Sequence, residues 1–385
     1  WAEALRYLTA RERDAHRAAY GDGTVQERCA DMEHGVAIQR VLRSLEYRNF
    51  VPPLRQSTVR RLYGSVLATS VSRLERFSAC PFSHFAADGL RLKERDVYKL
   101  EPADAGTFLH NALKEFVSQV QSGKQDWTAL TDADIDNAVS RVVERLIPQV
   151  QEEIFLSSAR YRHVGRALGR ITRRAAGVLA QHAKRAQFRP VALEAQFGLQ
   201  GKIPPLVLPL GELGQVTLRG QIDRLDACAV GDATYLRVID YKSSPRPLDL
   251  TDVYEGLSLQ LLVYLLVAVS SWKDIVPDYP PDSKVVPAGA LYFVVRDPII
   301  STSGPVPEEQ SKESLLKSFR MAGLVAGDRQ IAGLMDSEMK GYSPIIPVQF
   351  TKDALGARSS VVPKDKFPFL LDFVKEKVRE LRVKS

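Results

Sequence analysis

Cysteine is scarce in this sequence. Three cysteines, Cys29, Cys80 and Cys228, occur among its 385 residues. Because they lie far apart in sequence, neither a disulfide framework nor a self-contained CxxC metal knuckle can be read from them. The cysteine usage therefore argues against a disulfide-stapled secreted protein, and a reducing, cytoplasmic setting is expected.

Long apolar runs and nucleotide-binding loops are missing as well. The longest apolar run, Leu257–Val269, is interrupted by Ser258 and Gln260 and is too short to span a bilayer, so no membrane segment is expected. No G-x-x-x-x-G-K-[ST] motif occurs, so we do not expect this sequence to be an ATP motor by itself. It begins at Trp1 without a methionine or a signal-like segment, which favours a piece of a longer polypeptide.

What the sequence does contain is an ordinary globular composition with a mild basic excess. Hydrophobic residues make up 45% and charged residues 26%, and 53 Lys+Arg against 46 Asp+Glu give a net charge of +7. A chain of 385 residues is long enough for a large core and for two or three packed units. A protein with this positive charge can bind a polyanion such as nucleic acid, but the charge alone does not identify the binding partner.

The first part of the sequence has helical spacing. Residues 1–46 are rich in Arg, Ala, Glu and Leu at helical periods. In "TSVSRLERFSACPFSHF", Ser72 and Glu75 have the spacing of a capping box. Pro81 then ends the helix, because its ring disfavours a helical residue before it. Cys80 is therefore expected at a helix end.

Two further helical stretches follow. In "DAGTFLHNALKEFVSQV" the apolar residues recur with the helical period, with Gly106-Thr107 as the entry and His110 near the N-terminus. Residues 132–188 are mostly helical and basic, and they form either a positive face or an ordinary solvated helix surface. The basic residues in question are Arg162, Arg166, Arg170, Arg173, Arg174, Lys184 and Arg185.

From Val191 the apolar period changes to two residues. The segments "VALEAQFGL", "QVTLRGQIDRLDA" and "TYLRVIDYKSS" predict three strands separated by turns. A buried helix over 254–270 and a strand over 288–295 are expected next, then a helix around Lys312–Met335 and a closing helix near Phe369–Val383.

Charged residues occupy unusual places in these strands. Residues two apart along a strand share a face, so Asp240 and Lys242 project together. A hairpin through Gly231 would bring Asp223 beside Asp240. Two facing carboxylates repel unless a cation lies between them, and hard oxygen ligands suit Mg²⁺ or Mn²⁺. A lysine beside such a metal can stabilise charge that builds up on a phosphate.

A lone DxK tripeptide is most often a surface pair on an amphipathic strand. Here a second signal accompanies it, because Gln260 and Tyr264 lie four apart on one face of an otherwise apolar helix. Buried polar groups at this spacing need partners. The sequence therefore favours a site over a surface pair.

The blocks "GTFLHNAL", "GQIDRLD", "IDYK" and "LSLQLLVYLL", in this order, resemble the RecB-type nucleases of the PD-(D/E)XK superfamily. The resemblance is closest to the C-terminal nuclease domains of the AddB family of helicase-nuclease subunits. It covers roughly Ser70 to Val295, with supporting similarity in "GYSPIIPVQF". The combination is specific, unlike any one of its parts.

The resemblance implies a set of site residues. His110 matches the family's metal-ligating helical histidine, and Asp223 and Asp240 match its metal-binding and catalytic aspartates. Lys242 matches its catalytic lysine, and the backbone C=O of Tyr241 would be a further metal ligand.

Several other residues are expected near this site. By resemblance, Gln260 and Tyr264 form the QxxxY block that supports the site and the DNA strand near it. Arg224 is expected to have a DNA-binding or supporting role, through an ion pair with Asp226 that fixes the end of its strand. Glu194 is a further acidic candidate, although a glutamate on an amphipathic strand usually faces solvent.

The resemblance also raises the question of an iron–sulfur cluster. Related nucleases hold a [4Fe–4S] cluster with one cysteine before the nuclease motifs and three after them. Cys80 matches the first, but no cysteine follows Cys228, so a cluster would need cysteines outside this chain. The alternative is that Cys80 is a small buried apolar residue.

The resemblance implies an α/β restriction-endonuclease-like core with a mixed sheet, flanked by the helices at 107–120 and 254–270. Residues 66–385 would form the nuclease domain, with a helical insertion at about 125–188. Residues 1–65 would end an upstream helicase-like domain.

The implied activity is Mg²⁺-dependent exonucleolytic cleavage of single-stranded DNA. The chain would act with an AddA-type helicase-nuclease subunit in a heterodimer, during double-strand break repair by homologous recombination. Two alternatives stay open. One is a stand-alone iron–sulfur exonuclease of the CRISPR-associated type, and the other is a nuclease-dead DNA-binding scaffold subunit.

Overall fold

The structure is a computed structural model that describes most of the chain after residue 65. It covers residues 66–384 except 96, 124, 199–200, 202, 277–282, 300–303, 339 and 353, together with 55, 57, 58 and 61. The helical segment expected over 1–65 lies almost entirely outside the described residues.

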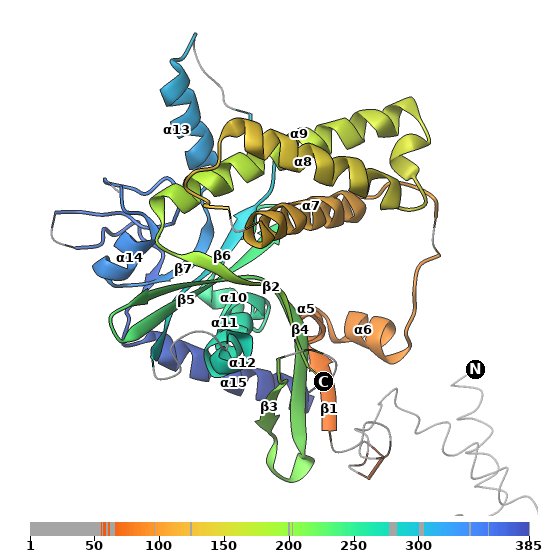
Figure 1. The fold of residues 1–385 in the computed structure, drawn as a ribbon. Coiled ribbons are helices and arrows are strands. Elements are labelled where there is room, and N and C mark those ends of the chain that lie inside the picture. Colours follow the sequence, from red (N-terminus) through yellow and green to blue (C-terminus); the bar gives the residue numbers. More distant parts are fainter. Residues whose placement is uncertain are drawn as a thin grey trace, which may run out of the picture. The chain divides into compact units, whose positions relative to one another are not determined.

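A mixed sheet forms the centre of the described part (Figure 1). Its strands are ordered β1-β4-β5-β6-β7-β8, and β2 and β3 also pair with β4. The strands are β1 (Val66–Ser70), β2 (Arg189–Phe197), β3 (Leu206–Pro209), β4 (Gln215–Val230), β5 (Ala233–Lys242), β6 (Lys284–Val294), β7 (Ala322–Ala326) and β8 (Val361–Val362). The expected α/β core with a mixed sheet is confirmed.

Strand β4 organises the sheet because it is long enough to have different neighbours along its length. Its first residues pair with β1 in parallel and with β3 antiparallel, and its later residues pair antiparallel with β2 and β5. The β4–β5 hairpin turns at Gly231, whose φ of +61° is a conformation that glycine adopts without strain. The hairpin predicted from the sequence is therefore present. Strand β5 then pairs in parallel with β6.

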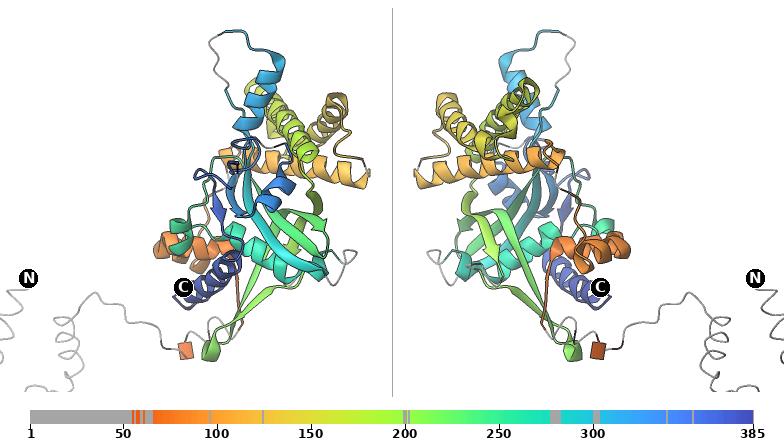
Figure 2. Two further views of the ribbon diagram at one scale, coloured as in Figure 1. Left: turned by 90° about the vertical axis from the view of Figure 1, so that its left-hand side faces the viewer. Right: turned by 90° about the vertical axis from the view of Figure 1, so that its right-hand side faces the viewer.

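Helices cover both faces of this sheet (Figures 1 and 2). Helices α7 to α9 lie on one side, and α11 lies on the other with α5 and α15 next to it. The helices are α5 (Val71–Ala79), α6 (Pro81–His84), α7 (Pro102–Ser122), α8 (Asp132–Leu146), α9 (Ala159–Arg185), α10 (Leu250–Tyr254), α11 (Gln260–Ser270), α12 (Trp272–Ile275), α13 (Glu308–Ser318), α14 (Arg329–Met335) and α15 (Phe367–Lys384).

The apolar pattern of each helix explains where it packs. Helix α7 buries one face that includes Phe108, Leu113 and Phe116, whereas α11 is buried from Leu261 to Ala268 and lies inside the core. The expected range 125–188 contains α8 and α9, which both pack on α7. In the described part, no helix has the length and apolar character that a membrane span needs.

Two predicted helix starts are wrong. Helix α5 begins at Val71, because Ser70 is still paired with β4, and Ser72 provides no cap; the Glu75 carboxylate binds elsewhere. Helix α7 begins at Pro102, where the Glu101 and Asp104 side chains form the capping box. His110 consequently lies well inside the helix and not near its end.

Two longer helical predictions are interrupted. The helix expected over 254–270 begins only at Gln260, as α11, because α10 ends at Tyr254 and Gly256 follows with a φ of +78°, where an added Cβ would approach Leu381 to 2.7 Å. The helix expected around 312–335 is divided by strand β7, because its small and apolar residues pair with β6. The closing helix is present as α15.

Candidate active site

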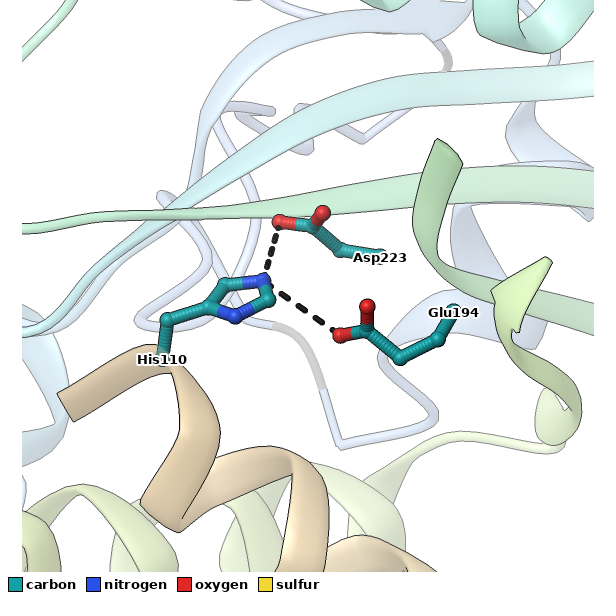
Figure 3. Close-up of side chains that lie close together, drawn as sticks. All are labelled: His110, Glu194 and Asp223. Atoms are coloured by element: carbon teal, nitrogen blue, oxygen red, sulfur yellow. Dashed lines mark ion pairs between the residues drawn. The ribbon is translucent and has the colours of Figure 1, made fainter. Parts of the chain in front are cut away.

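Three side chains from separate elements converge at one place (Figure 3). His110 comes from α7, Glu194 from β2 and Asp223 from β4. The Nε2 atom of His110 lies 3.0 Å from Asp223 Oδ2 and 3.5 Å from Glu194 Oε1. One ligand atom from each residue lies within 4.8 Å of the other two, which is a spacing that a metal ion can occupy. We refer to these three residues as the acidic triad.

The sheet register brings the two carboxylates of the acidic triad together. Leu193 pairs with Arg224 and Ala195 with Ile222, so Glu194 lies opposite Asp223. Glu194 has a φ of +51°, which is uncommon for a residue with a Cβ. Such strained conformations persist where the surroundings hold them, and they are concentrated at functional sites.

The Asp240–Lys242 pair lies next to the acidic triad. Lys242 Nζ is 2.6 Å from Asp240 Oδ2, so the two side chains share a face of β5 as predicted. The backbone N–H of Tyr241 donates to Asp223 Oδ2 at 3.0 Å and ties β5 to the acidic triad. Asp240 is only 1% exposed. Asp240 lies outside the acidic triad, and its carboxylate is paired with Lys242.

Helix α11 completes the site from the other side of Lys242. The Lys242 ammonium donates to Gln260 Oε1 at 3.3 Å, and Gln260 Nε2 donates to the Tyr264 hydroxyl at 3.0 Å. The structure therefore brings the predicted QxxxY block next to the predicted lysine. The amide orientation is fixed by these two partners, because its oxygen must face the cation.

The electrostatics of the site disfavour its negative charges. Burial raises the pKa of Asp240 to about 6, repulsion by Asp223 adds to this, and Lys242 opposes it. Burial likewise raises the pKa of Glu194, although His110 opposes the shift. Burial favours the neutral form of His110, but the hydrogen bond to Asp223 and the negative charges of Asp223, Glu194 and Asp240 together outweigh it and raise the pKa of His110. At Asp240 and Glu194, burial and the nearby Asp223 carboxylate thus outweigh the attraction of the cations beside them.

The donor set fits a divalent metal ion. Carboxylate oxygens suit Mg²⁺ and Mn²⁺, and imidazole nitrogen is accepted by Mn²⁺ and other first-row metals. Glu194 Oε1 is buried and accepts no hydrogen bond from the described residues, while its other oxygen lies 3.7 Å from Lys114 Nζ. A buried carboxylate oxygen without a hydrogen-bond donor is expected where that oxygen binds a metal ion, because the ion takes the place of the donor.

Arg224 does not reach the site, but its predicted ion pair with Asp226 is present, which fits the supporting one of its two expected roles. Its side chain is 5% exposed and binds both oxygens of Asp226, at 2.6 and 3.0 Å. Arg237 also donates to Asp226, so the expected ion pair is part of a buried cluster within the strands and not at a strand end. Because Arg224 follows Asp223 directly, it points to the opposite face of β4. We refer to Arg224, Asp226 and Arg237 as the buried charge cluster.

Cys80 lies between α5 and α6 and is exposed. Its sulfur accepts from the backbone N–H of Ser83 at 3.4 Å. The alternative that Cys80 is a buried apolar residue is therefore wrong. Cys228 is buried, and Cys29 lies outside the described residues.

Two acidic residues have larger roles in the structure than the sequence indicates. The sequence suggests a local cap for Glu75, but its Oε1 atom accepts from the backbone N–H groups of Leu259 and Gln260, at 2.7 and 3.0 Å. No local signal reveals this contact, because its partners lie more than 180 positions away in sequence. Glu194 is only a minor candidate from the sequence. Its position in the site becomes clear once the register between β2 and β4 is known, because this register places it opposite Asp223.

Comparison with known proteins agrees with this geometry. The family model of the PD-(D/E)XK nuclease superfamily matches residues 68–354, a range that contains the whole candidate site. The chain is also similar to proteins named as the B subunit of an ATP-dependent helicase/deoxyribonuclease. The relative from Desulforamulus reducens is 41% identical over 344 residues, which are 89% of this chain and 29% of the relative.

Two relatives from Bacillus carry the same name. The protein of Bacillus licheniformis is 42% identical over 334 residues, and that of Bacillus subtilis is 39% identical over 344 residues. These alignments cover 86% and 89% of this chain, and 28% and 29% of the relatives. The chain thus spans less than a third of the length of the curated relatives it matches. By the family match and these identities, this chain belongs to the PD-(D/E)XK nuclease superfamily.

Proposed function

We propose that this chain is a metal-dependent nuclease domain that hydrolyses phosphodiester bonds in single-stranded DNA. The observation that carries the proposal is the convergence of the acidic triad with the Asp240–Lys242 pair, 2.6 Å apart, and Gln260. Closely spaced carboxylates, two of them with raised pKa values, next to a partly exposed ammonium form a site that fits a metal ion and a phosphate.

The proposed ligands are His110, Asp223 and Asp240, with the backbone C=O of Tyr241. Glu194 is included as a further ligand because it belongs to the acidic triad. Mg²⁺ is the proposed ion, and Mn²⁺ fits the same donors. A bound divalent ion supplies Lewis acidity at the phosphate and lowers the pKa of a bound water.

The chain's own residues supply positioning and charge. Lys242 is 24% exposed and is held between Asp240 and Gln260, so its ammonium can donate to a non-bridging phosphate oxygen. A preorganised cation stabilises charge that develops on the phosphate without reorganising during the reaction. The Tyr241 N–H holds Asp223 in place and leaves its other oxygen available.

A basic surface supports a nucleic-acid substrate. Helix α9 contains no acidic residue in its 27 positions. Arg173 and Arg174 pair with Asp136 and Asp297, whereas Arg166 and Arg170 are exposed and have no acidic partner among the described residues. Exposed cations of this kind bind phosphates regardless of base sequence.

The names of the relatives suggest the larger assembly. They describe one subunit of a helicase/deoxyribonuclease, so we propose an AddA-type helicase-nuclease subunit as the partner in a heterodimer. The helicase would supply the single strand, and the nuclease would act exonucleolytically during double-strand break repair by homologous recombination. Cys80, being exposed, would ligate a [4Fe–4S] cluster together with cysteines outside this chain.

The test is cleavage of end-labelled single-stranded DNA with Mg²⁺ and with EDTA. Wild type is compared with Asp240→Ala and with Asp372→Ala, a control that removes an exposed carboxylate on α15. The expected result is cleavage that needs both Mg²⁺ and Asp240 and is unchanged in the control. DNA binding without cleavage under every condition would contradict the proposal and favour a nuclease-dead scaffold. A duplex competitor tests the strand preference.

A further inference from the structure

The N-terminus of α11 is capped by a residue from a distant part of the chain. Leu259, which precedes the helix, provides no side-chain cap. The backbone N–H groups of Leu259 and Gln260 instead donate to one oxygen of Glu75, 184 and 185 positions earlier on α5. The first N–H groups of a helix need such partners, and a carboxylate there also interacts favourably with the helix dipole.

Gln260 links this cap to the candidate lysine. It is the first residue of α11, so its backbone is held by Glu75, while its side-chain oxygen accepts from Lys242 Nζ at 3.3 Å. A shift of the first turn of α11 would therefore move the amide that holds the ammonium. Displacements of this kind at a catalytic group can reduce the rate strongly.

Both carboxylate oxygens of Glu75 take part in this contact with the start of α11. Its Oε1 atom accepts the two backbone hydrogen bonds, and its Oε2 atom lies 3.7 Å from Arg246 Nη2. Arg246 in turn donates to the carbonyl of Leu257 at 3.3 Å, in the segment that leads into α11. The Glu75 side chain is 13% exposed. Its contacts are those of a support and not of a group that touches substrate.

We propose that Glu75 is a positioning residue of the nuclease site, which anchors the first turn of α11 so that Gln260 holds Lys242. This inference rests on the proposed function. It adds Glu75 to the site as a residue that acts only through Gln260. It predicts that removal of Glu75 affects turnover more than substrate binding, because Glu75 itself does not touch the DNA.

The experiment compares Glu75→Ala, Gln260→Ala, the double variant and Asp328→Ala. Asp328 is a matched control, since its Oδ1 atom also accepts two backbone N–H groups at the start of a helix, those of Gln330 and Ile331 on α14. Only the cap on α11 should affect catalysis, although removal of either cap weakens the helix that it begins.

The expected result is a decrease in kcat of about 10-fold for Glu75→Ala, with KM for single-stranded DNA changed less than about 3-fold. The double variant should be no slower than Gln260→Ala, because Glu75 acts through that residue. Glu75→Gln, which keeps an acceptor oxygen, should recover most of the rate. Asp328→Ala should keep the wild-type kcat. Equal kcat in Glu75→Ala and Asp328→Ala, or fully additive losses in the double variant, would overturn the proposal.

Hydrogen exchange gives a readout that does not depend on cleavage. In Glu75→Ala, amide exchange over residues 257–262 should accelerate relative to wild type, and in Asp328→Ala it should not. Unchanged exchange there would overturn the anchoring even in an active enzyme. Absence of cleavage by wild type would count against the proposed function, and the exchange result alone would then decide whether Glu75 anchors α11.

Discussion

Two groups of charged residues that meet at strand β4 differ in how burial and neighbouring charges act on their carboxylates. In the buried charge cluster, two arginines surround Asp226, which is fully buried, and their interaction outweighs burial and lowers the pKa of Asp226. In the candidate site, Asp240 and Glu194 have raised pKa values because burial and neighbouring carboxylates dominate. A buried carboxylate whose cationic partners outweigh the effect of burial is typical of a structural role, whereas buried carboxylates with raised pKa values mark a candidate ligand site.

The largest expected effect is on the stability of the buried charge cluster. Asp226→Ala should lower the free energy of unfolding by about 3–5 kcal/mol, because it leaves two buried guanidinium groups without their common partner. Denaturant unfolding measures the change. Asp372→Ala, which removes an exposed pair with Lys375, should change it by less than about 0.5 kcal/mol. Similar small changes in both variants would contradict the structural role.

The opposite response is expected in the candidate site. Asp240→Asn should abolish cleavage and raise the free energy of unfolding in the absence of metal, on the order of 1 kcal/mol, because it removes a buried charge repelled by Asp223. Thermal unfolding with EDTA and a cleavage assay measure the two effects. A variant that is both inactive and clearly destabilised would show that the charge of Asp240 serves the fold.

A pH-dependent effect is expected beside the buried charge cluster. Burial, together with Arg237, Arg224 and Arg185, lowers the pKa of His182 to about 3. In the unfolded chain, His182 binds a proton near pH 6.5, whereas in the folded protein it stays neutral down to about pH 3. The contribution of neutral His182 to the free energy of unfolding is therefore fully present above pH 6.5 and is lost progressively as the pH falls towards 3. The decrease is on the order of 1 kcal/mol per pH unit.

His182→Phe should remove this pH-dependent contribution. The His182 ring packs edge-on against Phe293, so an aromatic replacement keeps much of the contact. Unfolding by denaturant at about pH 7.5, 6 and 5, a range that starts above the ordinary histidine pKa and ends below it, measures the difference between wild type and variant. The difference should shift in favour of the variant as the pH falls, and a constant difference would contradict the assignment.

The smallest expected effect concerns charges that are neither buried nor part of the site. Arg166→Ala and Arg170→Ala should each weaken single-stranded DNA binding modestly and reduce the salt dependence, by about 0.7 in the slope of log K against log salt for each phosphate that is no longer neutralised. Stability should change by less than about 0.5 kcal/mol. Fluorescence anisotropy at several salt concentrations measures the slope. An unchanged slope in both variants would mean that these arginines are an ordinary solvated surface.

The elements that carry the site could be predicted from the sequence where the pattern is local. The period-two alternation around Asp223 and Asp240 and the turn at Gly231 predict the hairpin, and the structure confirms it. The 2.6 Å contact of Lys242 with Asp240 follows from the same alternation. Local spacing of this kind fixes which side chains share a face.

The parts that could not be predicted depend on contacts between distant segments. The α11 cap requires α5 to lie against it, and nothing near Glu75 in the sequence indicates this. Glu194 reaches the acidic triad only because β2 pairs with β4 in one register, with a residue at positive φ. The helical prediction over β7 is wrong because small apolar residues favour neither structure until a strand edge is available.

The most direct test of the candidate site is metal binding without any turnover. Mn²⁺ binding to wild type, Asp223→Asn and Asp226→Asn is followed by electron paramagnetic resonance of the free ion, on samples shown to be folded by circular dichroism. Wild type should bind Mn²⁺, Asp223→Asn should lose most of the affinity, and any folded fraction of Asp226→Asn should retain it, because Asp226 lies in the buried charge cluster. Equal Mn²⁺ affinity in wild type and Asp223→Asn would contradict a metal site at the acidic triad.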